Sequence, residues 1–286
     1  MFARVLLILI CLDAGVLWAE GAPPQEDGPN GHRLVIIPAG EYPVGTEGFE
    51  PNPFRTVSLG AYAIATTETT NAQFAAFVLA TSYVTDAEKR GNGKVSLEGM
   101  ADWAWKTIKE ANWRQPFGPD GEMAADHPDD PVTQISGADA EAYTKWVGGR
   151  LPTNEEWEVA ARAGSVSLFP WGDRFDVGRA NVWNGASHRK NHGEDGYTYL
   201  SPVKSFPPNA WGLYDVVGNV FEYCQGLPAG IFTRKGQEDR LLSGRGGSWW
   251  CSEGTCAAYN LRDIGTMDKH GSLANQGFRI VFGRAK

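Results

Sequence analysis

Helix-start signals are the feature of this sequence that most limits its fold, because only three of them stand out. Each is a capping box, in which the side chain of a hydroxyl residue and the side chain of the third residue after it each accept a hydrogen bond from the other's backbone N–H. The three boxes begin at Thr70, Ser136 and Thr153. Apolar side chains follow each box at the spacing of one helix face. Residues 34–37 form one apolar run of the strand type, which ends at a Pro-Ala-Gly turn. Few regular elements are therefore predicted for a chain of 286 residues.

Glycine and tryptophan explain how such a chain can still bury a core. The sequence contains 35 glycines, which permit tight turns, and 11 tryptophans, whose large rings supply burial where regular elements are few. The segment 83–132 has weak periodicity and resembles a long loop, which inside a compact domain indicates either a function or an unrecognised element. We therefore predict a single α+β domain with little regular secondary structure over residues 33–286.

The first part of the chain is expected to lie outside this domain. Residues 1–19 have the pattern of a secretory signal peptide with cleavage after Ala19, and we expect no stable membrane insertion once this leader is removed. Residues 20–32 are a polar linker rich in proline and glycine, so order should begin near Arg33. The protein is therefore expected to be exported, either periplasmic or secreted.

Charge and motif content exclude several function classes. Thirty-four acidic residues against 26 basic ones give a net charge of -8, so nucleic acid and anionic membranes are not expected as main partners. The sequence has neither a glycine-rich phosphate loop between a strand and a helix nor a Gly-x-Ser-x-Gly elbow, which argues against nucleotide chemistry and serine hydrolysis. The histidines are scattered, and His188 and His192, which flank a polar loop, are expected to be exposed to solvent.

Cys251 and Cys256 are the residues that most directly suggest chemistry. They lie five positions apart, and the mature chain has one further cysteine, Cys224. Two thiolates at this spacing can form an easily reduced disulfide or hold one soft metal ion such as Cu(I). A structural disulfide that closes a small loop is equally compatible with the spacing, so these alternatives stay open.

Two polar loops offer oxygen ligands. Asn181 and Asp195 enclose one loop, while Asp215 and Glu222 straddle the other, which contains Gly218. Calcium takes about six to eight oxygen ligands, many of them backbone carbonyls, so both loops are chemically adequate. From spacing alone, side chains that cap turns are the simpler interpretation.

A series of short motifs runs through the whole mature chain in a fixed order. They include GRLPT at 149–153, GLYD at 212–215, RGGSW at 245–249 and GFR at 277–279, together with residues 35–40, 68–74, 83–88, 156–158, 169–172, 180–183 and 218–222. In this order the motifs resemble the formylglycine-generating enzyme family, also called the sulfatase-modifying factor family. The segments 97–100 and 112–116 are similar to its enzyme branch more than to its shorter binding-only relatives.

The resemblance implies a fold, an activity and a site. The implied fold is compact, irregular and related to C-type lectins. The implied activity is that of an oxidase that uses Cu(I) and molecular oxygen to convert a cysteine of a sulfatase to formylglycine. The implied site has copper ligands at Cys251 and Cys256, a catalytic serine at Ser248 and an asparagine that contacts the substrate at Asn275.

Further candidate residues come from the same resemblance and from the residues around the two cysteines. Trp249 and Trp250 are suitable walls for a site that excludes water, and Arg262 is the nearest basic residue after the pair, so all three are candidate substrate contacts. The two calcium sites of the family correspond to two sets of residues here, namely Asn181, Val182, Asp195 and Tyr197, and Asp215, Gly218, Val220 and Glu222.

The residues between the cysteines bear on the substrate. Residues 252–255 are Ser-Glu-Gly-Thr, where sulfatase-directed members have a basic and aromatic set. We therefore expect an exported oxidase that acts on a thiol-containing peptide, a sulfatase or a siderophore precursor. The alternative within the superfamily is a periplasmic oxidase that matures the chromophore of the siderophore pyoverdine. The alternative from another class is a non-catalytic binding or scaffold domain with a Cys251–Cys256 disulfide.

Overall fold

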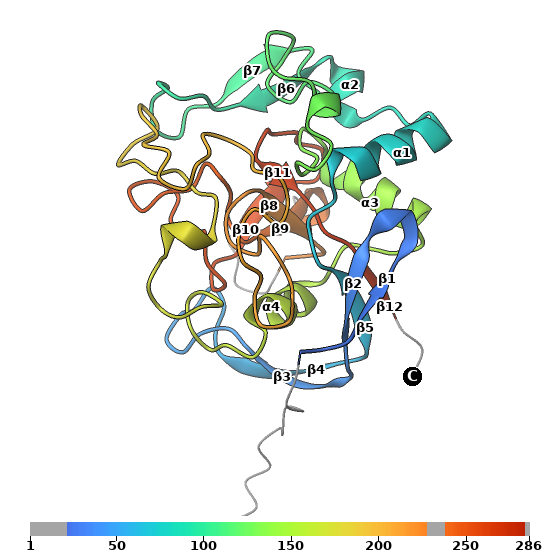
Figure 1. Ribbon diagram of the computed structural model, residues 1–286, viewed down its shortest axis with the longest axis vertical. Coiled ribbons are helices and arrows are strands. Elements are labelled where there is room, and N and C mark those ends of the chain that lie inside the picture. Colours follow the sequence, from blue (N-terminus) through green and yellow to red (C-terminus); the bar gives the residue numbers. More distant parts are fainter. Residues whose placement is uncertain (1–21, 228–237, 284–286) are drawn as a thin grey trace, which may run out of the picture.

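The computed structural model describes residues 22–227 and 238–283. The expected leader at 1–19 and the last three residues of the expected domain lie outside this part of the chain. Within it the predicted fold class is confirmed, because short helices and short strands alternate with long connections (Figure 1). None of the helices in the described ranges combines the length and the apolar character that a membrane crossing requires.

Two four-stranded sheets form the framework. The first is antiparallel and brings both ends of the described chain together, in the order β1 (Gln25–Asp27), β2 (Arg33–Ile37), β5 (Tyr62–Ala65) and β12 (Val281–Gly283). The second lies near the centre of Figure 1, in the order β10 (Gly265–Asp268), β9 (Leu241–Arg245), β8 (Phe221–Cys224) and β11 (Gln276–Gly277). In this sheet only β11 runs parallel to its neighbour, β8.

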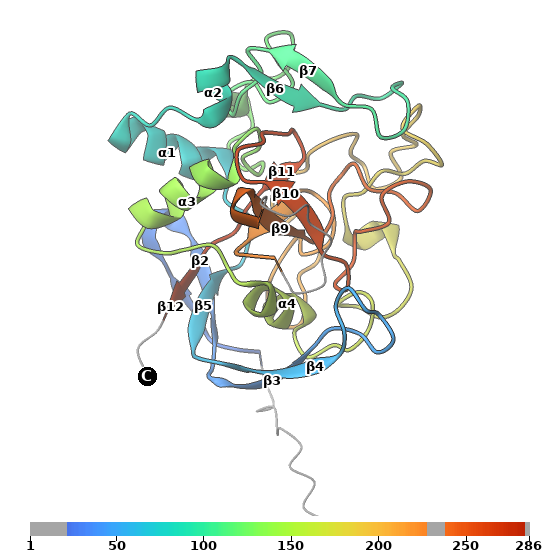
Figure 2. The same ribbon diagram turned by 180° about the vertical axis from the view of Figure 1, so that it is seen from behind.

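Two hairpins lie at opposite ends of the molecule in both Figures 1 and 2. One pairs β3 (Gly40–Val44) with β4 (Arg55–Leu59), and the other pairs β6 (Asn92–Val95) with β7 (Lys106–Lys109). The second hairpin belongs to the segment 83–132, which the sequence presented as a long loop. Its strands are too short to produce a clear period-two pattern, so this segment holds elements that periodicity missed.

The three predicted helices are present, each with both hydrogen bonds of its capping box. They are α1 (Asn71–Thr81), α3 (Gly137–Trp146) and α4 (Asn154–Arg162). A fourth, α2 (Asp86–Arg90), has the same capping box from Thr85 to Glu88 but only five residues, too few to show a face. Four single 3₁₀ turns complete the described elements: η1 (Pro29–Gly31), η2 (Ala124–Asp126), η3 (Val177–Arg179) and η4 (Glu238–Arg240).

The prediction of an unstructured linker at 20–32 is wrong. Strand β1 lies within these residues and pairs with β2, and His32 is buried with Nε2 2.8 Å from the hydroxyl of Tyr143. An edge strand can be held by backbone hydrogen bonds alone, so polar side chains in residues 25–27 did not prevent order. The folded structure therefore begins before Arg33.

Aromatic rings supply much of the burial, as the composition predicts. Six tryptophans of the described part of the chain are buried, and three of them form one cluster with Val95 and Ala274, namely Trp183, Trp249 and Trp250. Cys256 packs against this cluster from the half-exposed side. The aromatic core thus directly supports the cysteine segment that follows β9.

Candidate active site

The site is built on the turn that leaves β9. Gly246 and Gly247 follow this strand with φ values of 84° and 75°, which residues with a side chain rarely adopt. A Cβ atom on Gly247 would lie 2.4 Å from the Cα atom of Tyr259, so the two backbone segments also pass too close for a side chain. These glycines let the chain turn and place Ser248, at the start of the cysteine segment, in the interior.

The sulfur atoms of Cys251 and Cys256 face each other. They are 2.8 Å apart, both residues are free cysteines, and the thiol of Cys251 donates to the sulfur of Cys256. Burial, and then this hydrogen bond, raise the pKa of Cys251 well above its ordinary value, whereas the same bond lowers the pKa of Cys256. Since Cys256 is also partly exposed, it is the sulfur that ionises first and that is more accessible to a substrate.

Ser248 is oriented toward the buried sulfur. Its Oγ accepts from Nδ2 of Asn275 at 3.0 Å and from the backbone N–H of Trp250 at 3.4 Å. With both acceptor positions occupied, the hydroxyl hydrogen is left to point at Sγ of Cys251, 3.9 Å away. Oδ1 of Asn275 is buried and has no hydrogen-bond partner, so an acceptor remains open beside the pair.

Trp249 and Trp250 lie behind the pair as buried supports. Nε1 of Trp249 donates to the carbonyl oxygen of Ala274, and Nε1 of Trp250 donates to Oγ of Ser96. Trp103, which is 61% exposed, meets Trp250 edge to face with the ring centroids 5.1 Å apart. The exposed indole of this group is therefore Trp103, which no sequence motif singles out.

A pocket of about 610 Å³ opens beside the segment between the cysteines. Its lining includes the aromatic rings of Phe175, Trp183 and Tyr259 and the loop residue Glu253. Burial raises the pKa of Tyr259, and the charges of Glu253 and the two cysteines raise it further, so this phenol lies close to both the pocket and the sulfurs. The pocket borders the segment between the cysteines, although neither cysteine lines it, and it is a candidate entrance for a substrate.

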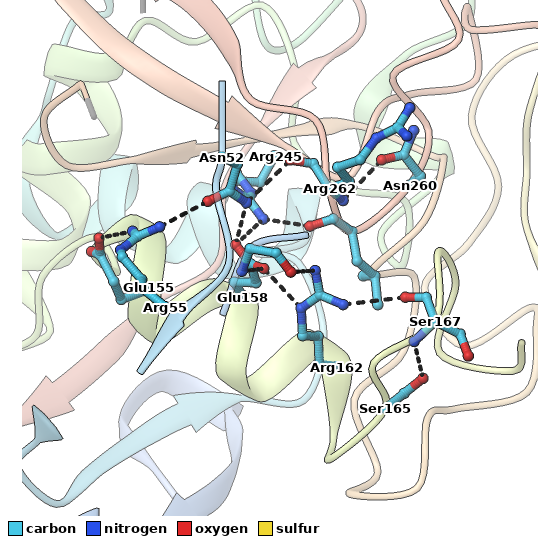
Figure 3. A network of polar contacts seen from close by, with 12 residues as sticks. Asn52, Arg55, Glu155, Glu158, Arg162, Ser165, Ser167, Arg245, Asn260 and Arg262 are labelled. Carbon is cyan, nitrogen blue, oxygen red and sulfur yellow. Dashed lines mark hydrogen bonds and ion pairs between the residues drawn. The ribbon is translucent and has the colours of Figure 1, made fainter. Parts of the chain in front are cut away.

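Arg262 is engaged in a different set of contacts. Its guanidinium covers the ring of Phe49 at 4.3 Å and lies 3.8 Å from the carboxylate of Asp263. Its carbonyl oxygen accepts from Asn52, which also bonds Glu158 in the network of Figure 3. The structure therefore places Arg262 in a supporting network, and a contact with substrate stays a prediction.

That network is centred on the buried carboxylate of Glu158, on α4. Glu158 accepts from Arg162 at 2.7 Å and from Arg245 at 2.9 Å, and both guanidinium groups are buried as well (Figure 3). Arg245, on β9, also donates to the carbonyl oxygen of Leu261. The network thus fixes the strand before the cysteine segment and the chain after it to the same helix.

The first predicted calcium set is brought together around Asp195. Its carboxylate accepts from the backbone N–H groups of Val182 at 2.9 Å and Tyr197 at 3.0 Å, next to Asn181. Carboxylate and main-chain oxygens are the hard ligands that calcium prefers, so these residue types suit the ion, although both carboxylate oxygens of Asp195 already accept backbone hydrogen bonds. The same bonds also cap the loop, and calcium here stays a prediction.

The second predicted calcium set fits less completely. Glu222 is bound by Arg279 and by Nε1 of Trp157, so its oxygens are already used. Oδ1 of Asp215, in contrast, is buried without a partner, and burial raises the pKa of Asp215 to about 6. Gly218 and Val220 offer only backbone atoms, and calcium at this second set stays a prediction.

The cysteine pair fits a soft cation with few ligands. Within the described ranges, no group of three or more His, Cys, Asp or Glu side chains is arranged to hold a metal ion. Cys251 and Cys256 would therefore be the protein's ligands for copper, and two sulfurs are the donors that favour Cu(I) over harder ions. Cys256 is the more exposed of the two residues, so an external third ligand would approach the pair from its side.

His188 is the functional candidate that sequence reasoning placed wrongly. It was expected to be exposed, but it is buried against Trp250, whereas His192 is exposed as expected. The burial depends on a partner 62 residues away, so no local pattern could reveal it.

The fold and the cysteine site define a protein of the sulfatase-modifying factor class. The family model of the Sulfatase-modifying factor enzyme 1-like domain matches residues 19–283, so the chain belongs to this family, and the predicted relationship is confirmed.

The relatives include proteins named as enzymes and proteins named as inactive. The chain is 38% identical to the formylglycine-generating enzyme of Thermomonospora curvata, covering 87% of this chain and 92% of that protein. It is 36% identical to the formylglycine-generating enzyme of Bos taurus, with coverages of 87% and 74%. It is also 36% identical to the inactive C-alpha-formylglycine-generating enzyme 2 of Mus musculus, with coverages of 93% and 91%. Overall identity therefore does not separate active from inactive relatives.

Solved structures support the fold. PvdO from Pseudomonas aeruginosa superposes with a TM-score of 0.68 at 22% identity, covering 93% of this chain and all of that chain. CarF superposes with a TM-score of 0.56 at 22% identity, covering 88% of this chain and 98% of that chain. At this identity the likeness concerns the fold alone.

Proposed function

We propose that this chain is an oxidase of the formylglycine-generating type that depends on copper and molecular oxygen and acts on a thiol-containing substrate. The observation that carries the proposal is the facing pair of Cys251 and Cys256, with the hydroxyl of Ser248 directed at the buried sulfur. Because relatives named formylglycine-generating enzyme and a relative named inactive are about equally identical to this chain, the support comes from the retained site.

The side chains of the pair have complementary tasks. Cu(I), when held by the two sulfurs, would supply a centre for a third thiolate and oxygen. Cys256 ionises more readily and presents the accessible sulfur, while Cys251 must lose its proton inside the protein. The hydroxyl of Ser248 can then donate to the buried thiolate, which offsets part of the cost of burying its charge.

The surrounding residues control access and orientation. Trp249 and Trp250 keep water from the inner side of the pair, since both indoles are buried and hydrogen-bonded. The open acceptor Oδ1 of Asn275 is available to an N–H group of the substrate. Positioning of this kind is the main contribution that the protein makes when a cofactor carries the chemistry.

The electron balance requires a second reductant. Oxidation of a –CH₂–SH group to an aldehyde takes up water, releases H₂S and removes two electrons and two protons. Reduction of O₂ to water takes four electrons. One substrate thiol, one O₂ and two reductant thiols thus give one aldehyde, one H₂S, one water and one disulfide.

The proposal includes a structural calcium ion and export from the cytoplasm. A calcium ion at the Asp195 loop would be structural, because its carboxylate already organises the backbone of residues 182–197. Export through the leader at 1–19 would expose the chain to thiol-containing peptides or sulfatases outside the cytoplasm.

Copper binding tests the metal site. The reduced, metal-free protein is titrated with Cu(I) in competition with a chromophoric chelator, alongside Cys251→Ser, Cys256→Ser and the control Cys224→Ala. We expect tight binding that both pair variants lose and the control retains, because Cys224 is a buried residue of a different element, β8. Indifference of the wild-type protein to copper would instead support a scaffold with a Cys251–Cys256 disulfide.

A peptide assay tests the reaction. The copper-loaded protein is incubated with a Cys-x-Pro-x-Arg peptide and a thiol reductant, under oxygen and under nitrogen, and the peptide is examined by mass spectrometry. We expect conversion of the thiol to an aldehyde under oxygen only, with none for Cys256→Ser. Retained copper binding without peptide oxidation would count against this substrate and would lead to a test of siderophore precursors of the pyoverdine type.

A further inference from the structure

His188 connects the cysteine segment to two other parts of the chain. Its imidazole stacks on the indole of Trp250, with ring centroids 4.1 Å apart and planes 13° apart. Trp183 meets the same imidazole edge to face at 5.3 Å. The side chain is fully buried, so its ring is held firmly against the residue that precedes Cys251.

The contacts of Nε2 determine where the ring carries hydrogen. This nitrogen lies 2.8 Å from the carbonyl oxygen of Trp250. A carbonyl oxygen only accepts, so Nε2 must carry a hydrogen and donate it. Nε2 also lies 3.4 Å from Oγ1 of Thr255, the residue before Cys256. One ring nitrogen thus contacts the residue before each cysteine.

The opposite side of His188 is anchored outside the cysteine segment. Its backbone N–H donates to Oδ1 of Asp102 at 2.7 Å, and its carbonyl oxygen accepts from the backbone of Gly99. Nδ1 lies 3.4 Å from the same oxygen of Asp102 but has no hydrogen-bond partner. Residues 99–102 therefore hold the backbone of His188 in place.

A second donor from the same loop acts beside His188. The backbone N–H of Trp183 donates to the carbonyl oxygen of Cys251 at 2.9 Å. The carbonyl groups of two consecutive residues, Trp250 and Cys251, are thus both bound by the segment 183–188. The backbone that carries the buried sulfur cannot rotate without breaking both bonds.

We propose that His188 is a positioning residue for the Cys251–Cys256 pair. Through Nε2 it donates to the residue before Cys251 and contacts the residue before Cys256, and so it fixes the backbone next to both cysteines and the separation and direction of the sulfurs. Contacts of this kind orient metal ligands and raise the effective concentration of one thiol toward the other. The role goes beyond the proposed oxidase function, since it applies equally to copper binding and to disulfide formation.

Two substitutions separate the hydrogen bond from the ring. His188→Phe keeps an aromatic ring against Trp250 without a donor, and His188→Gln keeps a donor near the place of Nε2 without the ring. In a Cys224→Ala background, the equilibrium between the metal-free pair and its disulfide is measured by mass spectrometry in glutathione buffers. We expect the constant for disulfide formation to fall about tenfold in His188→Phe and to stay within about twofold in His188→Gln.

Copper affinity provides a second readout. Cu(I) binding is expected to weaken about 10- to 100-fold in His188→Phe and to remain near the wild-type value in His188→Gln. If the wild-type protein does not bind Cu(I), the oxidase proposal fails, and the disulfide equilibrium still decides the role of His188. Unchanged disulfide equilibrium in His188→Phe, or equal losses in both variants, would overturn it.

A measurement on the unaltered protein covers the case in which a variant does not fold. ¹⁵N NMR of the imidazole identifies the nitrogen that carries hydrogen. We expect a hydrogen on Nε2 of His188 that exchanges slowly with water, since this group is buried and bonded to Trp250. A ring with hydrogen on Nδ1 alone would overturn the proposal.

Discussion

Nδ2 of Asn275 donates to Oγ of Ser248 at 3.0 Å, and this bond sets the direction in which the serine hydroxyl points. The two residues are 27 positions apart, yet the acceptor side of Ser248 is turned toward Asn275 and its hydrogen toward Cys251. An amide from near β11 therefore controls a donor on the cysteine segment.

Removal of that hydroxyl is expected to weaken the metal site. Ser248→Ala leaves the buried thiolate of Cys251 without its side-chain donor, so Cu(I) affinity should fall about tenfold in a chelator competition. Asn275→Ala keeps the hydroxyl but lets it rotate, and a smaller loss is expected. Equal affinities for the wild-type protein and Ser248→Ala would show that the hydroxyl does not support the sulfur.

The two sulfurs of the pair should differ in reactivity. In reduced, metal-free protein at pH 7, iodoacetamide is expected to modify Cys256 before Cys251 and Cys224, whose pKa values burial raises. Cys251→Ala should slow the reaction of Cys256, because the hydrogen bond that lowers the pKa of Cys256 is lost. Peptide mapping by mass spectrometry gives each rate, and Cys224→Ala is the control that should leave Cys256 unchanged.

The turn before Ser248 should not tolerate a side chain. Gly247→Ala combines a positive φ with the close approach of Tyr259, and we expect it to lower the free energy of unfolding by about 3 kcal/mol. Gly148→Ala has a positive φ but open space around its Cβ, and about 1 kcal/mol is expected. Urea denaturation gives both values, and equal losses would show that Tyr259 moves aside.

The Glu158 network should contribute strongly to stability. Glu158→Gln leaves the buried guanidinium groups of Arg162 and Arg245 without a countercharge, so the free energy of unfolding should fall by about 3 to 5 kcal/mol. Asp268→Asn, which breaks the exposed pair with Arg240, is the matched control and should cost less than about 1 kcal/mol. Losses of similar size in urea denaturation would contradict the central role of Glu158.

Local features of the fold could be predicted from the sequence, and long-range ones could not. The capping boxes at Thr70, Ser136 and Thr153 act within one helical turn, so a short pattern was sufficient to place α1, α3 and α4. The sequence at Thr85 has the same capping-box pattern, but the helix that it opens is too short for periodicity to confirm it. Strand β1 depends on pairing with β2, which polar composition conceals.

The candidate site shows the same division. The spacing of Cys251 and Cys256 allows their sulfurs to meet when the chain turns between them, but it leaves a metal site and a disulfide as open alternatives. The supports of the pair come from distant positions, as with His188 at 62 residues from Trp250 and Glu158 at 87 residues from Arg245. Their partners are chosen by tertiary packing, which one sequence does not encode as a pattern.

Acid should destabilise the protein through His32. Burial lowers the pKa of His32 from 6.5 to about 4, so between these values the unfolded chain binds a proton that the folded protein excludes. The free energy of unfolding should therefore fall by about 2 kcal/mol between pH 7 and pH 5 from this residue. Urea denaturation of the wild-type protein and His32→Gln at both pH values isolates the effect, because groups such as Asp130, whose pKa burial raises to about 6, titrate in both proteins. The wild-type protein should lose more stability than the variant, and equal losses would mean that the folded structure accepts a proton on His32 as readily as the unfolded chain does.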